Sequence, residues 1–187
     1  DDTPVQGIAG GDDSSADAND CLNGFRWQRT RFPVQVTRST DSSYRWLVNF
    51  PSPLPSGDET NDLVSVEWHA VRDDKGAVVH APAVVVVHES GSSMDVGRLF
   101  ARSMQAGGIH GFLVQLPYYG NRRSDGRPDS GDKLVRTLQQ GSGDVRRARD
   151  AVAAIPEVDG RYIAVQGTSL GGFVVACSAS LDNRFDD

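Results

Sequence analysis

The stretch RYIAVQGTSLGGFVVACSASL, residues 161–181, joins an apolar run typical of a buried strand to a second apolar run with helical spacing. The junction GTSLG, residues 167–171, matches the pattern G-x-S-x-G. In this turn between a strand and a helix, small residues two before and two after the serine let the backbone fold sharply, which lifts the serine above the sheet edge. The pattern therefore indicates Ser169 as a candidate nucleophile, with Gly167 and Gly171 as the elbow glycines.

The place of this turn in the chain supports the same interpretation. A chain rich in Gly and Ser can match three fixed positions by chance, but this match follows a strand-like run and opens a helix-like one. That context is the structural confirmation that the motif requires. It also places the backbone N–H of Leu170 at a helix N-terminus, where free amide groups can stabilise an oxyanion.

The chain before Pro82 is patterned differently from the chain after it. Residues 1–20 are mostly Asp, Ser, Gly and Ala, and we expect them to form a disordered acidic tail ahead of one domain at 21–187. Short alternating runs separated by turn-rich segments then predict antiparallel strands. These runs lie at residues 32–37, 44–50 and 63–71.

After Pro82, apolar strands alternate with amphipathic helices, and this alternation predicts an α/β fold with a mostly parallel sheet. The runs predicted as strands buried on both faces are 83–88, 111–117 and 162–167. The predicted helices are 94–108, with Ser93 as its N-cap, a short one near 133–138, another at 143–155 and one after Ser169.

From about residue 63 to 181 the sequence resembles the α/β-hydrolase superfamily, and its dienelactone-hydrolase-like and acetyl-xylan-esterase-like branches more than lipases. The resemblance covers the N-terminal half of that fold. It implies a three-layer sandwich with antiparallel first strands and a parallel sheet, truncated after the nucleophile-elbow helix.

The resemblance also extends to two loops. In the family a turn of the type HG-x after the third strand supplies a second oxyanion-hole N–H, and VVVVHESGSS occupies that place, with His88 matching the histidine and Ser90 the amide donor. Glu89 departs from the family, which usually has Gly there. LPYYGNRR resembles the loop that borders the substrate cavity, so Tyr118 and Tyr119 are candidate substrate contacts; packing at the cavity rim is the alternative.

A serine nucleophile needs a general base, usually His, oriented by a carboxylate. In this superfamily both partners follow the nucleophile in the chain, but only 18 residues follow Ser169 (187 minus 169) and none is His. We expect a fragment of a longer hydrolase, a chain that pairs the free edge of strand 162–167 with a partner, or an inactive remnant.

Composition narrows the remaining function classes. A net charge of −6 disfavours nucleic acid as a partner, and no apolar run is long enough to cross a bilayer, so we expect a soluble protein. Cys21 and Cys177 are too few for a disulfide framework, and two free thiols are the simpler interpretation. No metal-ligand cluster or phosphate-binding glycine loop argues for a cofactor. The chain starts without Met or a signal peptide, so export is open and the compartment is not determined.

The sequence thus predicts a serine hydrolase that cleaves a small-molecule carboxylic ester through an acyl-enzyme on Ser169, represented by an incomplete and inactive chain. A serine peptidase of the prolyl-oligopeptidase-like branch is the close enzymatic variant. The alternative from another class is a non-catalytic binding or interaction module on the same scaffold. His88, like the other three histidines, also has a purely structural interpretation, as does a buried Ser169.

Overall fold

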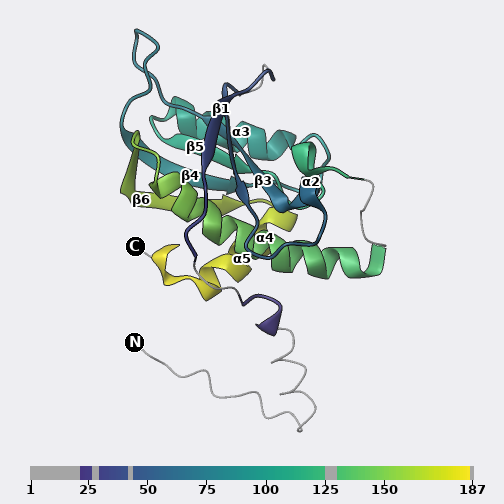
Figure 1. Cartoon of the computed structure of the whole chain (residues 1–187). Coiled ribbons are helices and arrows are strands. Elements are labelled where there is room, and N and C mark those ends of the chain that lie inside the picture. Colours follow the sequence, from purple (N-terminus) through teal and green to yellow (C-terminus); the bar gives the residue numbers. More distant parts are fainter. Residues whose placement is uncertain (1–21, 27–29, 42–43, 125–129, 186–187) are drawn as a thin grey trace.

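Six strands form one mixed sheet in the computed structural model, which describes residues 22–26, 30–41, 44–124 and 130–185 (Figure 1). The expected acidic tail at 1–20 lies outside the described residues. The strands are β1 Gln35–Arg38, β2 Trp46–Pro51, β3 Leu63–His69, β4 Ala81–Val87, β5 His110–Val114 and β6 Val158–Gly167. Their order across the sheet is β1-β2-β3-β5-β4-β6.

The first three strands run antiparallel, as their alternating sequences predict. Val48, Phe50, Val64 and Val66 are buried, whereas the intervening residues of β2 are half-buried. The turn-rich segment between β2 and β3 contains a single helical turn, α2 Glu59–Asp62, which the sequence did not predict. The Asp58 carboxylate caps it by accepting hydrogen bonds from its backbone amides.

The parallel part of the sheet consists of β5, β4 and β6, and β3 joins it by pairing antiparallel with β5. Strands β4 and β5 are buried almost throughout, as expected for central strands with helices on both faces. The same expectation is wrong for β6, where Tyr162 is 59% exposed and Ala164 is also exposed. The reason is position, because β6 pairs only with β4 among the described strands.

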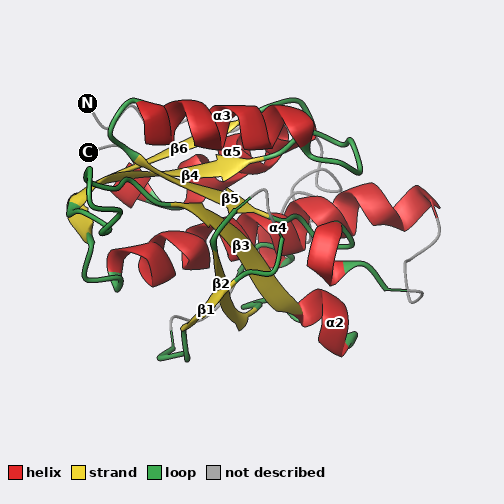
Figure 2. Ribbon diagram, turned by 90° about the horizontal axis from the view of Figure 1, so that it is seen from above, coloured by secondary structure: helices red, strands yellow, loops and turns green. Residues whose placement is uncertain are grey.

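Helices cover both faces of the sheet. Helix α3 Asp95–Ala106 lies on one face and α4 Ser130–Ala153 on the other (Figure 2). Helix α5 Leu170–Leu181 packs beside α4, and the Ser178 hydroxyl donates a hydrogen bond to the Ser142 carbonyl. The three layers are those predicted from the alternation of strands and helices. No helix in the described ranges combines the length and apolarity needed to span a bilayer.

Helix α4 is one continuous element of 24 residues, so the prediction of two helices at 133–138 and 143–155 is wrong. The polar, glycine-containing run near Gly141 and Gly143 suggested a break because glycine disfavours helix. In the fold these glycines allow close packing: a Cβ on Gly141 would lie 3.2 Å from Leu116, and one on Gly143 would lie 3.1 Å from Leu54. Contacts from distant segments therefore compensate for the low helix propensity of this run.

Candidate active site at the carboxyl ends of the parallel strands

Ser169 occupies a strained backbone conformation between β6 and α5. Its φ of 52° and ψ of −118° lie outside the regions that L-residues ordinarily adopt. A Cβ on Gly167 would lie 2.3 Å from the Gly171 carbonyl oxygen, and one on Gly171 would lie 2.2 Å from the Val87 oxygen. Only glycine fits at either position, so both glycines are needed to hold Ser169 in this conformation.

The side chain of Ser169 is exposed, and no described side chain forms a hydrogen bond with its hydroxyl. Helix α5 begins at the next residue, Leu170. Among the described residues nothing accepts a hydrogen bond from the Leu170 amide, whereas the amides of Gly171 and Gly172 bond the carbonyls of Thr168 and Ser169. A free amide therefore follows the serine at the positive end of a helix dipole.

The loop 88–91 follows the carboxyl end of β4, beside the carboxyl end of β6 that leads to Ser169. Val87, the last residue of β4, is the register partner of Gly167 at the end of β6. Ser90, three residues beyond Val87, and Ser169, two beyond Gly167, thus leave the ends of adjacent parallel strands. The structure therefore brings the two candidate oxyanion-hole segments to one side of the sheet.

Glu89 holds this loop against the start of α3. Its carboxylate accepts hydrogen bonds from the amides of Val96, at 3.1 Å, and Gly97, at 3.0 Å. The expected N-cap Ser93 does not cap the helix and instead donates a hydrogen bond to Asp95. A carboxylate from seven residues upstream thus satisfies free amides at the helix N-terminus, a position that favours negative charge.

Ser90 is held through its carbonyl group, which accepts a hydrogen bond of 3.1 Å from the Tyr119 hydroxyl. No described residue accepts a hydrogen bond from the Ser90 amide. Tyr119 is buried and packs edge-on against His88, with 4.8 Å between the ring centroids. Tyr119 thus positions the loop that carries Ser90, a role that its place in the sequence did not reveal.

His88 is fully buried, and both ring nitrogens are used for structure. Nε2 accepts a hydrogen bond from the Leu116 amide, and Nδ1 lies within hydrogen-bonding distance of the Glu89 carbonyl. Burial lowers the pKa of His88, which keeps the ring neutral and suits the acceptor role of Nε2. The structural interpretation of His88 is confirmed.

The other histidines also lie away from the elbow. Nδ1 of buried His110 accepts hydrogen bonds from the Trp68 indole and the Val71 amide, and its Nε2 faces the Val79 and Glu157 carbonyls. His69 lies at the end of β3, with Nε2 3.8 Å from Glu67. His80 precedes the amino end of β4, whereas Ser169 follows the carboxyl end of β6. The described residues therefore place no imidazole on the Ser169 hydroxyl.

Glu67 and Arg98 tie α3 to the sheet beside the loop 88–91. Glu67 is fully buried, and its carboxylate accepts hydrogen bonds from Arg98, the shortest at 2.7 Å, and from Gln115 at 3.0 Å. Although burial raises the pKa of Glu67, its interactions with His69, Arg98 and Gln115 outweigh this and lower it. Arg98 also donates to the Ser93 carbonyl, so the ionised pair fixes the segment that leads into α3.

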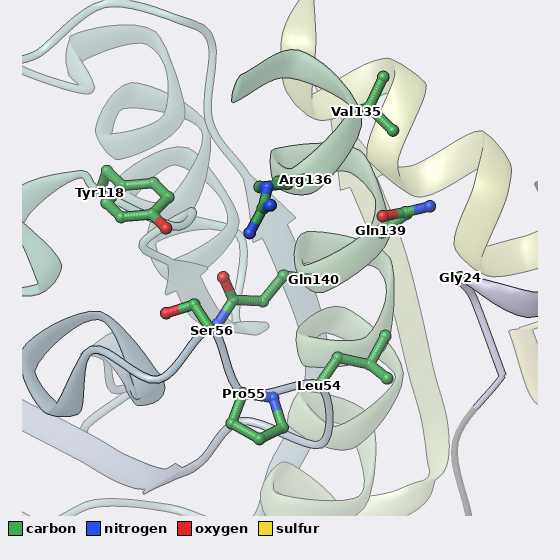
Figure 3. Close-up of a pocket in the computed structure, with 9 residues that line it drawn as sticks. All are labelled: Gly24, Leu54, Pro55, Ser56, Tyr118, Val135, Arg136, Gln139 and Gln140. Carbon is green, nitrogen blue, oxygen red and sulfur yellow. The ribbon is translucent and has the colours of Figure 1, made fainter. Parts of the chain in front are cut away.

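Tyr118 lines a pocket of about 560 Å³ between the loop at Leu54–Ser56 and α4 (Figure 3). Its φ is 68°, and the Asn61 side chain accepts a hydrogen bond from its amide, which fixes the backbone. The pocket is lined by Gly24, Leu54, Pro55, Ser56, Tyr118, Val135, Arg136, Gln139 and Gln140. Ser169 and Tyr119 are not part of this lining, so the structure separates the two candidate tyrosines.

Arg122 fixes the loop that carries both tyrosines. Its side chain is completely buried and donates hydrogen bonds to the carbonyls of Asn61 and Gln115. It also forms an ion pair with Asp144 of α4. The burial of Arg122 could not be predicted from the segment GNRR, because arginines in a polar loop are expected at the surface.

Similar folds occur among solved esterases. A putative acetyl xylan esterase from Bacteroides fragilis NCTC 9343 superposes with a TM-score of 0.64 at 15% identity, over 91% of this chain and 50% of its own. The acetyl xylan esterase from Paenibacillus sp. R4 gives 0.55 at 19% identity, over 95% and 58%. Acetyl xylan esterase 1 from Thermoanaerobacterium sp. JW/SL YS485 gives 0.54 at 17% identity, over 92% and 56%.

No protein-family model matches the sequence, and no curated protein matches it either. The chain spans about half the length of the three solved esterases. At these identities the likeness concerns the fold alone. The chain therefore has an α/β-hydrolase-like fold.

Proposed function

We propose that this chain is part of a serine hydrolase that cleaves carboxylic esters through an acyl-enzyme on Ser169. The observation that carries the proposal is the backbone of Ser169, whose strained φ and ψ expose the side chain between β6 and the first turn of α5. Strain of this kind persists where surrounding packing enforces it, and here Gly167 and Gly171 allow that packing. The fold shared with solved acetyl xylan esterases supports ester chemistry.

The proposed reaction begins with attack of Ser169 Oγ on the ester carbonyl carbon while the hydroxyl proton passes to a base. The negative charge that develops on the carbonyl oxygen is stabilised by the amides of Leu170 and Ser90. Collapse of the tetrahedral intermediate breaks the ester C–O bond, and the alcohol leaves with a proton. Water then attacks the acyl-enzyme, releasing the carboxylic acid and restoring the Ser169 hydroxyl.

The supporting residues act indirectly in this scheme. Glu89 anchors the loop to α3 and Tyr119 holds the Ser90 carbonyl, so the Ser90 amide stays oriented without its own acceptor. Tyr118 remains the candidate substrate contact because its ring lines a pocket near the carboxyl end of β5. Tyr119 is better assigned to positioning the loop that carries Ser90.

The base is the missing component. The rings of His88 and His110 are committed to backbone and indole partners, and no described side chain contacts the Ser169 hydroxyl. General-base catalysis contributes about 10²- to 10⁴-fold to such reactions. We therefore expect the 187-residue chain to acylate slowly and to turn over poorly.

The test compares the 187-residue chain with the product of the complete open reading frame that encodes it. Each is treated with a fluorophosphonate probe, and the adduct is located by peptide mass spectrometry. We expect the adduct on Ser169, absent in Ser169→Ala and retained in Ser103→Ala, which removes an exposed serine of α3. Hydrolysis of p-nitrophenyl acetate and of a peptide p-nitroanilide separates esterase from peptidase. An unlabelled Ser169 in both proteins contradicts the proposal.

A binding module on the same scaffold is the second candidate. The observation that favours it is that His88 is used for structure: its Nε2 accepts a hydrogen bond from the Leu116 amide. The adjacent loop is stabilised by Glu89, which caps α3. This alternative predicts saturable ligand binding that Ser169→Ala leaves intact, with no probe adduct. The labelling experiment therefore distinguishes the two candidates.

A further inference from the structure

A second pocket of about 560 Å³ lies far from Ser169. It is lined by Ser39, Thr40, Asp41, Tyr44, Arg45, Trp68, His69, Ala70, Arg72 and Gln105. His69 ends β3 and is the register partner of Gly111 near the start of β5, whereas Ser169 follows the carboxyl ends of β4 and β6. The pocket therefore lies at the amino ends of the parallel strands, whereas the elbow lies at their carboxyl ends. It is independent of the proposed reaction.

Positive charge gathers at this pocket although the whole chain carries a net charge of −6. Arg45 and Arg72 line it, and neither forms an ion pair with any residue in the described ranges. Burial, followed by the charges of Arg45 and Arg38, lowers the pKa of Arg72, and no carboxylate offsets this. The guanidinium groups thus repel one another, and neither has an ion-pair partner among the described residues.

One buried donor of the pocket also lacks a partner. Arg72 Nε is buried and has no hydrogen-bond acceptor among the described residues. Tyr44, which is only 8% exposed, lines the same pocket. A buried donor is almost always paired with protein, water or ligand. The unpaired Nε of Arg72, in a pocket lined by two arginines, therefore points to an external acceptor.

The neighbouring carboxylates, Glu67 and Asp41, interact with Arg98. Glu67 binds Arg98 through short hydrogen bonds, and it is Glu67, with a smaller contribution from Asp41, that raises the pKa of Arg98. Asp41 also lines the pocket, and its charge helps to raise the pKa of Arg98. The two arginines of the lining, Arg45 and Arg72, thus outnumber its one carboxylate.

We propose that this pocket binds a small molecule carrying a carboxylate or phosphate group, with Arg72 and Arg45 as the charged donors and Tyr44 as a hydroxyl donor. The planar guanidinium group presents its Nε–H and an Nη–H side by side, a geometry that matches two oxygens of one oxyanion. Neutralisation by the ligand relieves the repulsion between the arginines, so binding also stabilises the folded chain.

The experiment titrates sodium phosphate or sodium acetate against sodium chloride at constant ionic strength, following the thermal midpoint and tryptophan fluorescence, since Trp68 lines the pocket. The wild-type chain should show a saturable rise in midpoint with at least one anion. Arg72→Gln and Arg45→Gln should weaken that affinity roughly tenfold or more. Arg102→Gln, which removes an exposed arginine of α3 outside the pocket, should leave it unchanged.

A second signature separates a site from general attraction of anions. In chloride alone, Arg45→Gln should raise the thermal midpoint because it removes repulsion from Arg72, while the further rise with phosphate or acetate should need a roughly tenfold higher anion concentration. Arg45 is exposed, so this variant keeps the test decisive even if Arg72→Gln does not fold. Saturation with phosphate alone would identify a phosphate group as what the pocket binds, and saturation with acetate alone would identify a carboxylate. No saturation with either anion, or an equal loss in Arg102→Gln, overturns the proposal.

Discussion

Asp144 of α4 lies 2.8 Å from the guanidinium of Arg122, and neither side chain is exposed to solvent. The Ser52 hydroxyl donates a hydrogen bond to Asp144, at 2.6 Å, while Arg122 donates to the Gln115 carbonyl. This pair connects the long helix on one face of the sheet to the loop that follows β5. It is thus a buried polar link between α4 and the segment carrying Tyr118.

Replacing Asp144 with Ala should destabilise the fold by about 3–5 kcal/mol, because Arg122 is then left buried without its counter-charge. The measurement is urea unfolding followed by circular dichroism. Asp159→Asn is the control, since it removes the carboxylate partner of Arg161, whose side chain is 78% exposed, and should move the midpoint much less. If Asp144→Ala unfolds at the wild-type midpoint, the buried pair is not a structural link.

Gly171 and Gly172 are adjacent but should respond oppositely to alanine. A Cβ on Gly171 would collide with the Val87 carbonyl oxygen at 2.2 Å, so Gly171→Ala should cost about 1–3 kcal/mol or more. A Cβ on Gly172 would lie 3.7 Å from its nearest neighbour, an ordinary contact. Gly172→Ala should therefore stabilise α5 by up to about 1 kcal/mol. Equal unfolding free energies for the two variants would contradict this geometry.

Glu89→Ala should lower the free energy of unfolding by about 1 kcal/mol, the usual cost of losing a helix cap. The loss arises because the amides of Val96 and Gly97 no longer have a carboxylate acceptor. Asp95→Asn, which changes a charge in the first turn of α3 without touching those amides, should cost only a few tenths of a kcal/mol. A smaller effect for Glu89→Ala than for Asp95→Asn would rule out the capping role.

The buried histidines should make stability decrease on mild acidification. Burial lowers the pKa values of His88 and His110 in the folded chain, whereas unfolded histidine titrates near ~6.5. Below that pH the unfolded chain binds more protons than the folded chain, so the free energy of unfolding falls as the pH drops. Urea midpoints at closely spaced pH values between about 7.5 and 5 would show the decline.

The same series in His110→Gln gives the control, because removing one titrating ring should flatten the pH dependence. Carboxylates such as Glu67, whose pKa is lowered, lose their contribution only at more acidic pH. A midpoint that stays constant between neutral pH and pH 5 would mean that the rings are protonated in the folded chain. Such a result would conflict with the acceptor roles of His88 and His110.

Local patterning predicted much of this architecture. The β-branched run of β4 and the apolar run of β5 are buried as expected, and the helix predicted after Ser169 spans residues 170–181. The elbow could be anticipated because its glycines and its neighbours in sequence carry the whole signal. Features determined within about ten residues are accessible in this way.

Features that depend on distant partners were not accessible. Ser93 is a favourable N-cap residue, but the cap comes from Glu89, whose orientation depends on the whole loop. Helix α4 runs through Gly141 because residues from other elements pack closely there, a contact that helix propensity does not encode. The part played by Tyr119 likewise depends on Ser90, twenty-nine positions away. Tertiary contacts override local preference at each of these places.

The one-sided pairing of β6 has a consequence for the rate at which its amide protons exchange with solvent. In a parallel pair only alternate amides of an edge strand bond the neighbour, so the others along β6 point away from β4. No described strand protects those protons, and Tyr162 and Ala164 are exposed. The strand that carries Ser169 to its place should therefore take up deuterium early, like the other edge strand β1, while β4 and β5 retain their protons longest.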